Sequence, residues 1–250
     1  MHSKAIVRPP GTKYTGCISS HPRLKELDAA LAREQHRKYV ATLRDLGLEV
    51  IEMPALDSHP DSCFVEDTAV VHGKKALIGN LRPPSRKGEE VSVEELLKTY
   101  LECRSVPPPA TLEGGDVIHL PDRLISGVTQ RTSPDGVDAM SGWLEVRVDT
   151  VEDQDVVHLK SHVTYLDEGI LLGTRRFSEH PVFGGLKMLL IPQKESYAAN
   201  ALFVNGTVLV AAGHPKTAEA VRRTGFEVIE LPVTEFEKCE GALTCLSIIF

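Results

Sequence analysis

Residues 69–78 are Ala69-Val70-Val71-His72-Gly73-Lys74-Lys75-Ala76-Leu77-Ile78, and this segment is the best guide to the architecture of the chain. It holds two short apolar runs around a turn that contains glycine, which is the pattern of a β-hairpin. The same pattern, with Gly, Asp or Asn in the turn, returns at 117–126, 162–173 and 202–211. The hairpins recur at intervals of about 40 to 48 residues, which is typical of a repeat architecture. If the units surround an axis, their equivalent positions meet at one end of it.

Helical segments are expected between the hairpins. The strongest helix is predicted from Pro22 to roughly Leu46, where leucines recur at helical spacing among charged residues and Gly47 follows as a stop. Shorter helices are expected at 93–101, 136–143 and 215–225, and further strands at 5–7, 49–53, 188–191, 227–231 and 246–249. We therefore predict an α/β chain with more strands than helices.

The composition is that of an ordinary globular protein. The 250 residues are 42% hydrophobic and 25% charged, which favours a single domain over 1–250. The opening segment, Met1 to Arg8, has no long apolar stretch, and nowhere do about 18 consecutive apolar residues occur, so a soluble cytoplasmic protein is expected. The net charge of −7 argues against nucleic acid and acidic membranes as partners, since both require clustered Lys and Arg. A small cationic ligand fits this charge better.

The five cysteines lie at positions 17, 63, 103, 239 and 245, without a CxxC pair. An odd number in no disulfide-dense pattern predicts reduced thiols. Cys245, close to the C-terminus, is a candidate nucleophile, because a thiolate beside a cation is reactive. The alternative is a buried structural thiol, which is our interpretation of Cys63 and Cys103. The sequence has no HExxH motif and no tight Cys/His cluster, so neither a metal nor another cofactor is expected.

Two acidic groups are candidate partners of that cysteine. Asp61, Glu66 and Asp67 form the first, and Glu113 and Asp116 flank a Gly-Gly pair in the second. Carboxylates at the inner ends of strands suggest a guanidinium or ammonium ligand, since a buried carboxylate is costly without a cation. For Asp61 and Asp116 the alternative is a capping or turn role. If 66–67 belongs to a strand, alternation sends its two side chains to opposite faces.

A histidine and two arginines complete the candidate site. The residues alone favour a histidine near 158–162 as the base and do not choose between His158 and His162. Arg86 and Arg131 lie in predicted loops, and a planar guanidinium suits recognition of a carboxylate. For either arginine, a solvated surface charge is the commoner explanation.

These residues fall in segments that resemble dimethylarginine dimethylaminohydrolase, a guanidine-modifying family of the pentein superfamily. The matching segments follow one another in family order over essentially the whole chain: Pro60-Asp61-Ser62-Cys63-Phe64-Val65-Glu66-Asp67, Pro84-Ser85-Arg86-Lys87-Gly88-Glu89, Thr111-Leu112-Glu113-Gly114-Gly115-Asp116-Val117, Arg131-Thr132, His158-Leu159-Lys160-Ser161, Glu195-Ser196-Tyr197-Ala198-Ala199-Asn200 and Gly241-Ala242-Leu243-Thr244-Cys245-Leu246-Ser247. The resemblance implies the pentein fold, a five-bladed α/β propeller of ββαβ units in a pseudo-fivefold arrangement.

The resemblance also implies roles for single residues. Cys245 would be the nucleophile and His158, which opens the His-Leu-Lys motif, the general acid and base, with Glu113 completing the set. Substrate binding would fall to Cys17, Asp61, Glu66, Asp67, Arg86, Arg131 and Cys239. Within this list, Arg131 would hold an α-carboxylate, Cys17 would lie in a lid loop, and Cys239 would offer its backbone carbonyl.

The activity that the resemblance implies is hydrolysis of asymmetric dimethylarginine or monomethylarginine to citrulline and dimethylamine or methylamine, through a covalent thiouronium on Cys245. Arginine deimination or amidino transfer on the same site is the nearest rival activity, since only the leaving group or the acceptor changes. Two more distant functions are a non-catalytic amino-acid-binding module and a metal-dependent hydrolase. A methylated arginine is thus the expected partner, and a homodimer is considered as the assembly.

Overall fold

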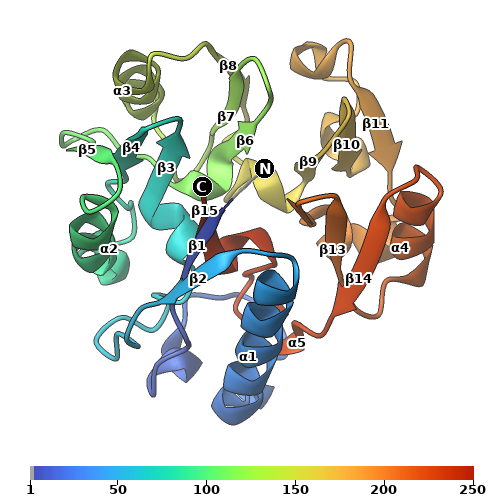
Figure 1. Cartoon of the computed structure of the whole chain (residues 1–250), viewed down its shortest axis with the longest axis horizontal. Coiled ribbons are helices and arrows are strands. Elements are labelled where there is room, and N and C mark those ends of the chain that lie inside the picture. Colours follow the sequence, from blue (N-terminus) through green and yellow to red (C-terminus); the bar gives the residue numbers. More distant parts are fainter. Residues whose placement is uncertain (1–2) are drawn as a thin grey trace.

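The computed structural model describes residues 3–250, so Met1 and His2 of the opening segment lie outside the described residues. Within that range, five three-stranded sheets surround a common axis like the blades of a propeller (Figure 1). In each sheet the middle strand pairs antiparallel with one neighbour and parallel with the other. The predicted five-bladed α/β propeller is confirmed.

Four of these sheets each occupy a continuous stretch of the chain, and one joins its two ends. The strands of successive sheets are β3 (Ala69–His72), β4 (Lys75–Ile78) and β5 (Glu102–Ser105); β6 (Val117–His119), β7 (Leu124–Val128) and β8 (Val148–Glu152); β9 (Val163–Asp167), β10 (Ile170–Gly173) and β11 (Lys187–Leu190); β12 (Leu202–Val204), β13 (Thr207–Ala211) and β14 (Glu227–Leu231); and β15 (Ser247–Ile249), β1 (Lys4–Val7) and β2 (Glu49–Glu52). The four predicted hairpins are confirmed. The sequence pattern does not predict β5 and β8, because these edge strands are rich in polar residues and only partly buried.

The sheet that joins the ends closes the ring. Strand β15 pairs antiparallel with β1, so that Ala5 lies opposite Ile249, and β1 pairs in parallel with β2. Both β1 and β15 lie near the centre of the ring (Figure 1). Cys245, two residues before β15, therefore has the same place in its blade as the residues that precede β3, β6 and β9.

The helices are α1 (Ala29–Asp45), α2 (Glu89–Leu97), α3 (Pro134–Leu144), α4 (Pro215–Arg222) and the short α5 (Thr234–Glu237). Helices α1 to α4 lie on the outside of the ring (Figure 1). The prediction of a helix from Pro22 is wrong at its start, because Asp28 is the N-cap: its carboxylate accepts from the amides of Ala30 at 2.8 Å and Leu31 at 3.1 Å. Within residues 3–250, no helix is long and apolar enough to cross a bilayer.

Helix α2 begins earlier than the sequence pattern predicts. Gly88 is the residue before the helix and has a φ of +100°, a conformation that favours glycine. Glu89 and Glu90 follow in the first turn, where acidic side chains interact favourably with the helix dipole. The apolar pattern begins only at Val93, so periodicity alone places the start too late.

A short 3-10 turn precedes the first strand of each sheet. The turns are η3 (Val65–Thr68), η5 (Gly114–Asp116), η6 (Leu159–Ser161), η9 (Gln193–Ala199) and η10 (Thr244–Leu246). Turn η3 contacts η5 and η10, and η6 contacts η5 and η9. A Cβ on Gly114 would lie 2.1 Å from the carbonyl oxygen of Glu66, which shows how closely these turns approach. The predicted convergence of equivalent positions is therefore confirmed.

Apolar side chains fill the space between neighbouring sheets. One cluster joins Val70 and Leu77 of the β3–β5 sheet to Val117 and Leu124 of the β6–β8 sheet, and all four are buried. Burying a large aliphatic side chain stabilises a protein by about 1.5–3 kcal/mol. Packing of one sheet against the next therefore fixes the ring on which the turns lie.

Candidate active site

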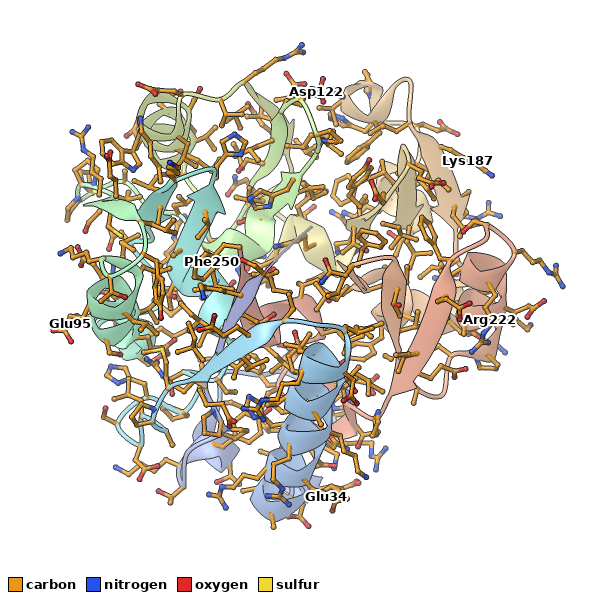
Figure 2. The ribbon with its side chains drawn as sticks, in the orientation of Figure 1. Glu34, Glu95, Asp122, Lys187, Arg222 and Phe250 are labelled. Carbon is orange, nitrogen blue, oxygen red and sulfur yellow. A yellow bond between two sulfur atoms is a disulfide. The ribbon has the colours of Figure 1, made fainter. Side chains whose placement is uncertain are left out.

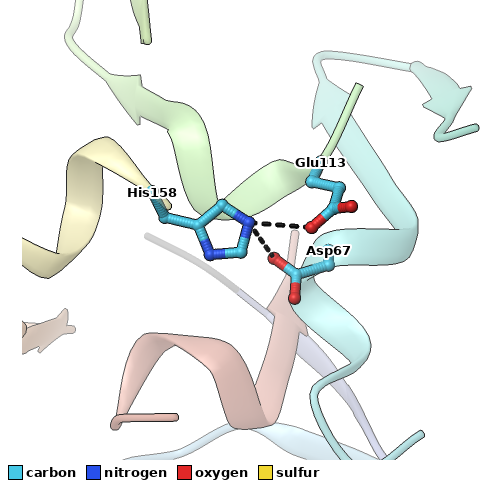
Figure 3. A group of neighbouring side chains, drawn as sticks. All are labelled: Asp67, Glu113 and His158. Carbon is cyan, nitrogen blue, oxygen red and sulfur yellow. Dashed lines mark hydrogen bonds and ion pairs between the residues drawn. The ribbon is translucent and has the colours of Figure 1, made fainter. Parts of the chain in front are cut away.

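The ring of turns brings a histidine and two carboxylates together (Figure 3). His158 directly precedes η6, Glu113 directly precedes η5, and Asp67 lies in η3. The Nε2 atom of His158 lies 2.8 Å from Oε2 of Glu113 and 3.6 Å from Oδ1 of Asp67. Gly115 makes room for this cluster, because a Cβ there would lie 2.8 Å from the imidazole ring and 2.7 Å from Oδ1 of Asp67. Segments 45 or more residues apart thus form one site.

The surroundings of His158 favour its protonated form. Burial lowers the pKa of this imidazole, but the charges of Asp67, Asp116 and Glu113 and the hydrogen bond to Glu113 outweigh burial and raise the pKa to about 9. At neutral pH the side chain is therefore an imidazolium that can give up a proton. His162 instead contacts the ring of Phe177, with centroids 5.6 Å apart.

Arg86 is buried, and protein groups engage all of its guanidinium nitrogens. Nη1 donates to Oδ2 of Asp67 at 2.7 Å, Nη2 donates to the carbonyl oxygen of Phe64 at 3.2 Å, and Nε donates to Oε2 of Glu89 at 3.0 Å. Burial raises the pKa of Asp67, but the charges of His158 and Arg86 outweigh it and lower the pKa to about 2. Asp67 is therefore ionised, with a cation on either side.

Glu113 is fully buried and is held by groups from several segments. Its Oε1 atom accepts a hydrogen bond from the amide of Arg82 at 2.9 Å, while Oε2 faces His158. The Nη1 atom of Arg131 lies 3.9 Å from Oε1 of Glu113, a loose pairing, and the Arg131 side chain is 17% exposed against 5% for Arg86. Of the two arginines predicted to bind a carboxylate, Arg131 is thus the one whose guanidinium is freer to bind a substrate carboxylate.

Glu66 and Asp67 are adjacent but have different partners. The carboxylate of Glu66 is paired with Nζ of Lys160 and accepts a hydrogen bond from Oγ1 of Thr244 at 2.7 Å. Burial raises the pKa of Glu66, with Lys160 opposing the rise. Glu66 and Lys160 also line a separate hollow of about 950 Å³, to which Asp67 does not contribute. The two side chains diverge as predicted, but in a 3-10 turn rather than a strand.

The remaining predicted acids hold backbone segments in place. Asp116 accepts hydrogen bonds from Oγ1 of Thr129 and from the amide of Leu159, both at 2.8 Å, which confirms the capping role considered for it. Asp61 accepts from the amide of Ile18 at 3.1 Å. It therefore ties the loop of residues 17–21, which we call the lid loop, to the segment that leads into η3.

Cys245 lies in η10, between Thr244 and the strand that closes the ring. Its side chain is half-buried and forms no disulfide. Burial and the negative charges of Glu66 and Asp67 raise the pKa of this thiol to about 12. The resting side chain is therefore a neutral thiol, and it requires an added positive charge to become a nucleophilic thiolate.

Cys17 and Cys239 form a disulfide, with Cα atoms 5.9 Å apart. The prediction of reduced thiols is therefore wrong for this pair. The two cysteines are separated by 222 residues, so no local spacing rule reveals the pair; the closing of the ring brings them together. The bridge attaches the lid loop to the 238–241 segment, and Oγ of Ser19 reinforces it by donating to the carbonyl oxygen of Lys238 at 2.8 Å.

The His158 cluster has the donor types of a metal site. One ligand atom each from Asp67, Glu113 and His158 lies within 4.8 Å of the others. Two guanidinium groups nevertheless compensate these carboxylates, since Nη1 of Arg86 is 2.7 Å from Asp67 and Nη1 of Arg131 is 3.9 Å from Glu113. These carboxylates therefore have cationic partners without a metal ion, and the arrangement suits proton transfer by His158.

Comparison with known proteins places the chain in a family. A sequence model for "N,N dimethylarginine dimethylhydrolase, eukaryotic" matches residues 20–167. The chain is 33% identical to the N(G),N(G)-dimethylarginine dimethylaminohydrolase of Pseudomonas aeruginosa over 100% of both sequences. It belongs to the dimethylarginine dimethylaminohydrolase family. The family member from Streptomyces coelicolor is 37% identical over 98% of this chain and 96% of its own length.

Solved structures of the family superpose closely on the chain. A cysteine-to-serine variant of the Pseudomonas aeruginosa enzyme in complex with citrulline gives a TM-score of 0.97 at 32% identity, covering 100% of both chains. The N-terminal domain of ArgZ, an arginine dihydrolase, gives a TM-score of 0.89 at 22% identity over 100% of this chain and 97% of its own, and shares the fold. The family resemblance inferred from the sequence motifs is therefore confirmed.

Several residues that support the site are not among the predicted site residues. Glu89 holds Arg86, Lys160 and Thr244 hold Glu66, and Asn200 accepts from the amide of Thr244 at 3.0 Å. All four lie inside the motifs that carry the family resemblance, which was the available signal. Sequence alone does not show that their side chains point at the predicted site residues.

Proposed function

We propose that the protein hydrolyses asymmetric dimethylarginine and monomethylarginine to citrulline and a methylated amine. The observation that carries the proposal is the imidazolium of His158, held by the carboxylates of Glu113 and Asp67 in the same ring of turns as Cys245. The names of the Pseudomonas and Streptomyces relatives and the citrulline held by the Pseudomonas structure support the choice of substrate.

Charge complementarity would orient the substrate. The carboxylate of Asp67 would supply the negative charge for a guanidinium, while the adjacent Glu66 is paired with Lys160. Arg131, only loosely paired with Glu113, would bind the α-carboxylate. Asp61, which accepts a hydrogen bond from the lid loop, would face the α-ammonium of the substrate. The disulfide-linked Cys17 and Cys239 would form the rim of the substrate pocket.

The first chemical step forms a bond between sulfur and carbon. The bound guanidinium places a positive charge beside Cys245 and offsets the carboxylates that raise the pKa of this thiol, so the thiol proton is released to solvent. The thiolate attacks the guanidinium carbon. His158 then gives its proton to the methylated nitrogen, the carbon–nitrogen bond breaks, and the amine leaves a thiouronium on Cys245.

The second step returns the enzyme to its resting state. His158, now neutral, accepts a proton from a water molecule, and the hydroxide attacks the thiouronium carbon. The carbon–sulfur bond breaks, which gives citrulline and restores the cysteine. Glu113 fixes the imidazole through the 2.8 Å contact. Its carboxylate stabilises the imidazolium before His158 gives up a proton in the first step and after it accepts one in the second.

The direct test compares three substrates under identical conditions. Purified protein is incubated with asymmetric dimethylarginine, monomethylarginine or arginine, and citrulline and the released amine are quantified. We expect citrulline with dimethylamine and with methylamine, and little ammonia from arginine. Cys245→Ser should abolish turnover, while Cys103→Ser, a half-buried thiol in β5, should not.

Two results would overturn the proposal. Faster turnover of arginine than of either methylated substrate would assign the site to deimination, in which ammonia is the leaving group. Wild-type rates in Cys245→Ser would exclude cysteine catalysis altogether.

A further inference from the structure

Glu89 is a charged side chain that lies behind the site and does not face the substrate space. It is the first residue of α2 and is fully buried, with 0% of its surface exposed. Its Oε2 atom accepts hydrogen bonds from Nη2 of Arg86 at 2.8 Å and from Nε at 3.0 Å, and Oε1 lies 3.2 Å from Nε. This side-on contact uses one whole edge of the guanidinium.

The opposite end of the same guanidinium meets the site. Nη1 of Arg86 donates to Oδ2 of Asp67 at 2.7 Å and lies 4.0 Å from Oε2 of Glu113. The other carboxylate oxygen of Asp67 lies 3.6 Å from Nε2 of His158. Buried acidic and basic groups therefore alternate in one line: the carboxyl of Glu89, the guanidinium of Arg86, the carboxylate of Asp67 and the imidazolium of His158. Burial raises the pKa of Glu89 to about 7, with Arg86 opposing the rise, so Glu89 is ionised above that pH.

We propose that Glu89 is a positioning residue that neutralises Arg86 from behind, so that the charge of Asp67 remains available to hold a cationic guanidinium. This inference rests on the proposed function. Without Glu89, Asp67 would be the sole anionic group within 3 Å of the Arg86 guanidinium among the described residues, and it alone would compensate that buried charge. The pocket would then be less negative where the substrate cation binds.

The loss is expected to depend on the charge of the ligand. Asymmetric dimethylarginine carries a positive guanidinium, whereas citrulline has a neutral ureido group on the same amino-acid frame. Glu89 lies behind Asp67, with Arg86 between them. Removing the negative charge of Glu89 should weaken the binding of dimethylarginine by roughly tenfold or more and leave the affinity for citrulline within about twofold. A purely structural role would weaken both ligands together.

The experiment measures the dissociation constants of both ligands by calorimetry in a Cys245→Ser background, where no turnover occurs, at a pH above 7, where Glu89 is ionised. Glu89→Gln removes the buried charge. Glu95→Gln is the matched control, because Glu95 is on the exposed side of the same helix and points away from the ring (Figure 2). We expect weaker dimethylarginine binding in Glu89→Gln alone, and a raised KM for dimethylarginine when the same substitution is made with Cys245 intact.

Glu89→Asp provides a second measurement and is decisive if Glu89→Gln does not fold. It retains the charge but withdraws the carboxylate from Arg86 by one methylene, so dimethylarginine should bind more weakly by a smaller factor, with citrulline again unchanged. Equal losses for both ligands, or affinities equal to those of Glu95→Gln, would overturn the inference. If the wild-type protein turns over no methylated arginine, the proposed function fails instead, which is a distinguishable result.

Discussion

The environment of His158 leads to a quantitative prediction for Glu113→Gln. The pKa of about 9 lies well above the ordinary value of 6.5, and at 1.4 kcal/mol per pKa unit the difference corresponds to about 3 kcal/mol in favour of the imidazolium. Glu113 lies 2.8 Å from Nε2, and unit charges about 4 Å apart interact by about 4 kcal/mol at an effective dielectric constant of 20. Glutamine keeps a hydrogen-bond acceptor but removes this charge, so the pKa should fall by at least about one unit.

The assay is an NMR titration of protein labelled at histidine. His158→Gln identifies the resonance among the ten histidines of the sequence, and Glu95→Gln controls for loss of a distant charge. In the wild-type protein, kcat/KM should decline as the pH rises through about 9, because the general acid loses its proton, and Glu113→Gln should move this decline to lower pH. A pKa for His158 in Glu113→Gln within a few tenths of the wild-type value would refute the reasoning.

Three further predictions concern the disulfide, a buried histidine and the substrate carboxylate. Reduction of Cys17–Cys239, or Cys17→Ser, should lower the free energy of unfolding by about 2–5 kcal/mol, because the bridge closes a loop of 222 residues; an unchanged melting temperature on reduction, with Cys103→Ser as control, would contradict this. His36 is buried, its Nε2 has no hydrogen-bond partner among the described residues, and burial lowers its pKa to about 4. The unfolded chain therefore binds more protons, so stability should fall by up to about 3 kcal/mol as the pH drops from about 6.5 to 4, and denaturant titrations of His36→Leu should lack this loss. Arg131→Gln should raise KM for dimethylarginine by roughly 10–100-fold with a smaller effect on kcat, and steady-state kinetics showing an unchanged KM would assign the carboxylate to another group.

The sequence predicts the hairpins well because their signal is local. A short turn with Gly, Asp or Asn between two apolar runs, as at Gly73, indicates each hairpin, and the regular spacing predicts the ring. The polar edge strands β5 and β8 carry no such signal. Closure of the ring by β1 and β15 depends on a pairing between the two ends of the chain, which no window of sequence contains.

The sequence proposes the candidate site as a set of residues but does not give the contacts between them. Motifs choose His158 over His162, but only the three-dimensional arrangement shows that Arg86 is occupied by Asp67 and Glu89. Long-range contacts of this kind depend on how neighbouring turns are placed. The same reason explains the Cys17–Cys239 bridge, whose partners come together only when the ring closes.

The most direct test of cysteine catalysis is mass spectrometry of the protein quenched during turnover of asymmetric dimethylarginine. We predict an adduct on the peptide that contains Cys245, formed with release of dimethylamine, and its loss in His158→Gln, which cannot protonate the leaving amine in the first step. A protein that makes citrulline at wild-type rate with Cys245 replaced by serine, or that carries the adduct on Cys63 or Cys103 instead, would contradict the central claim.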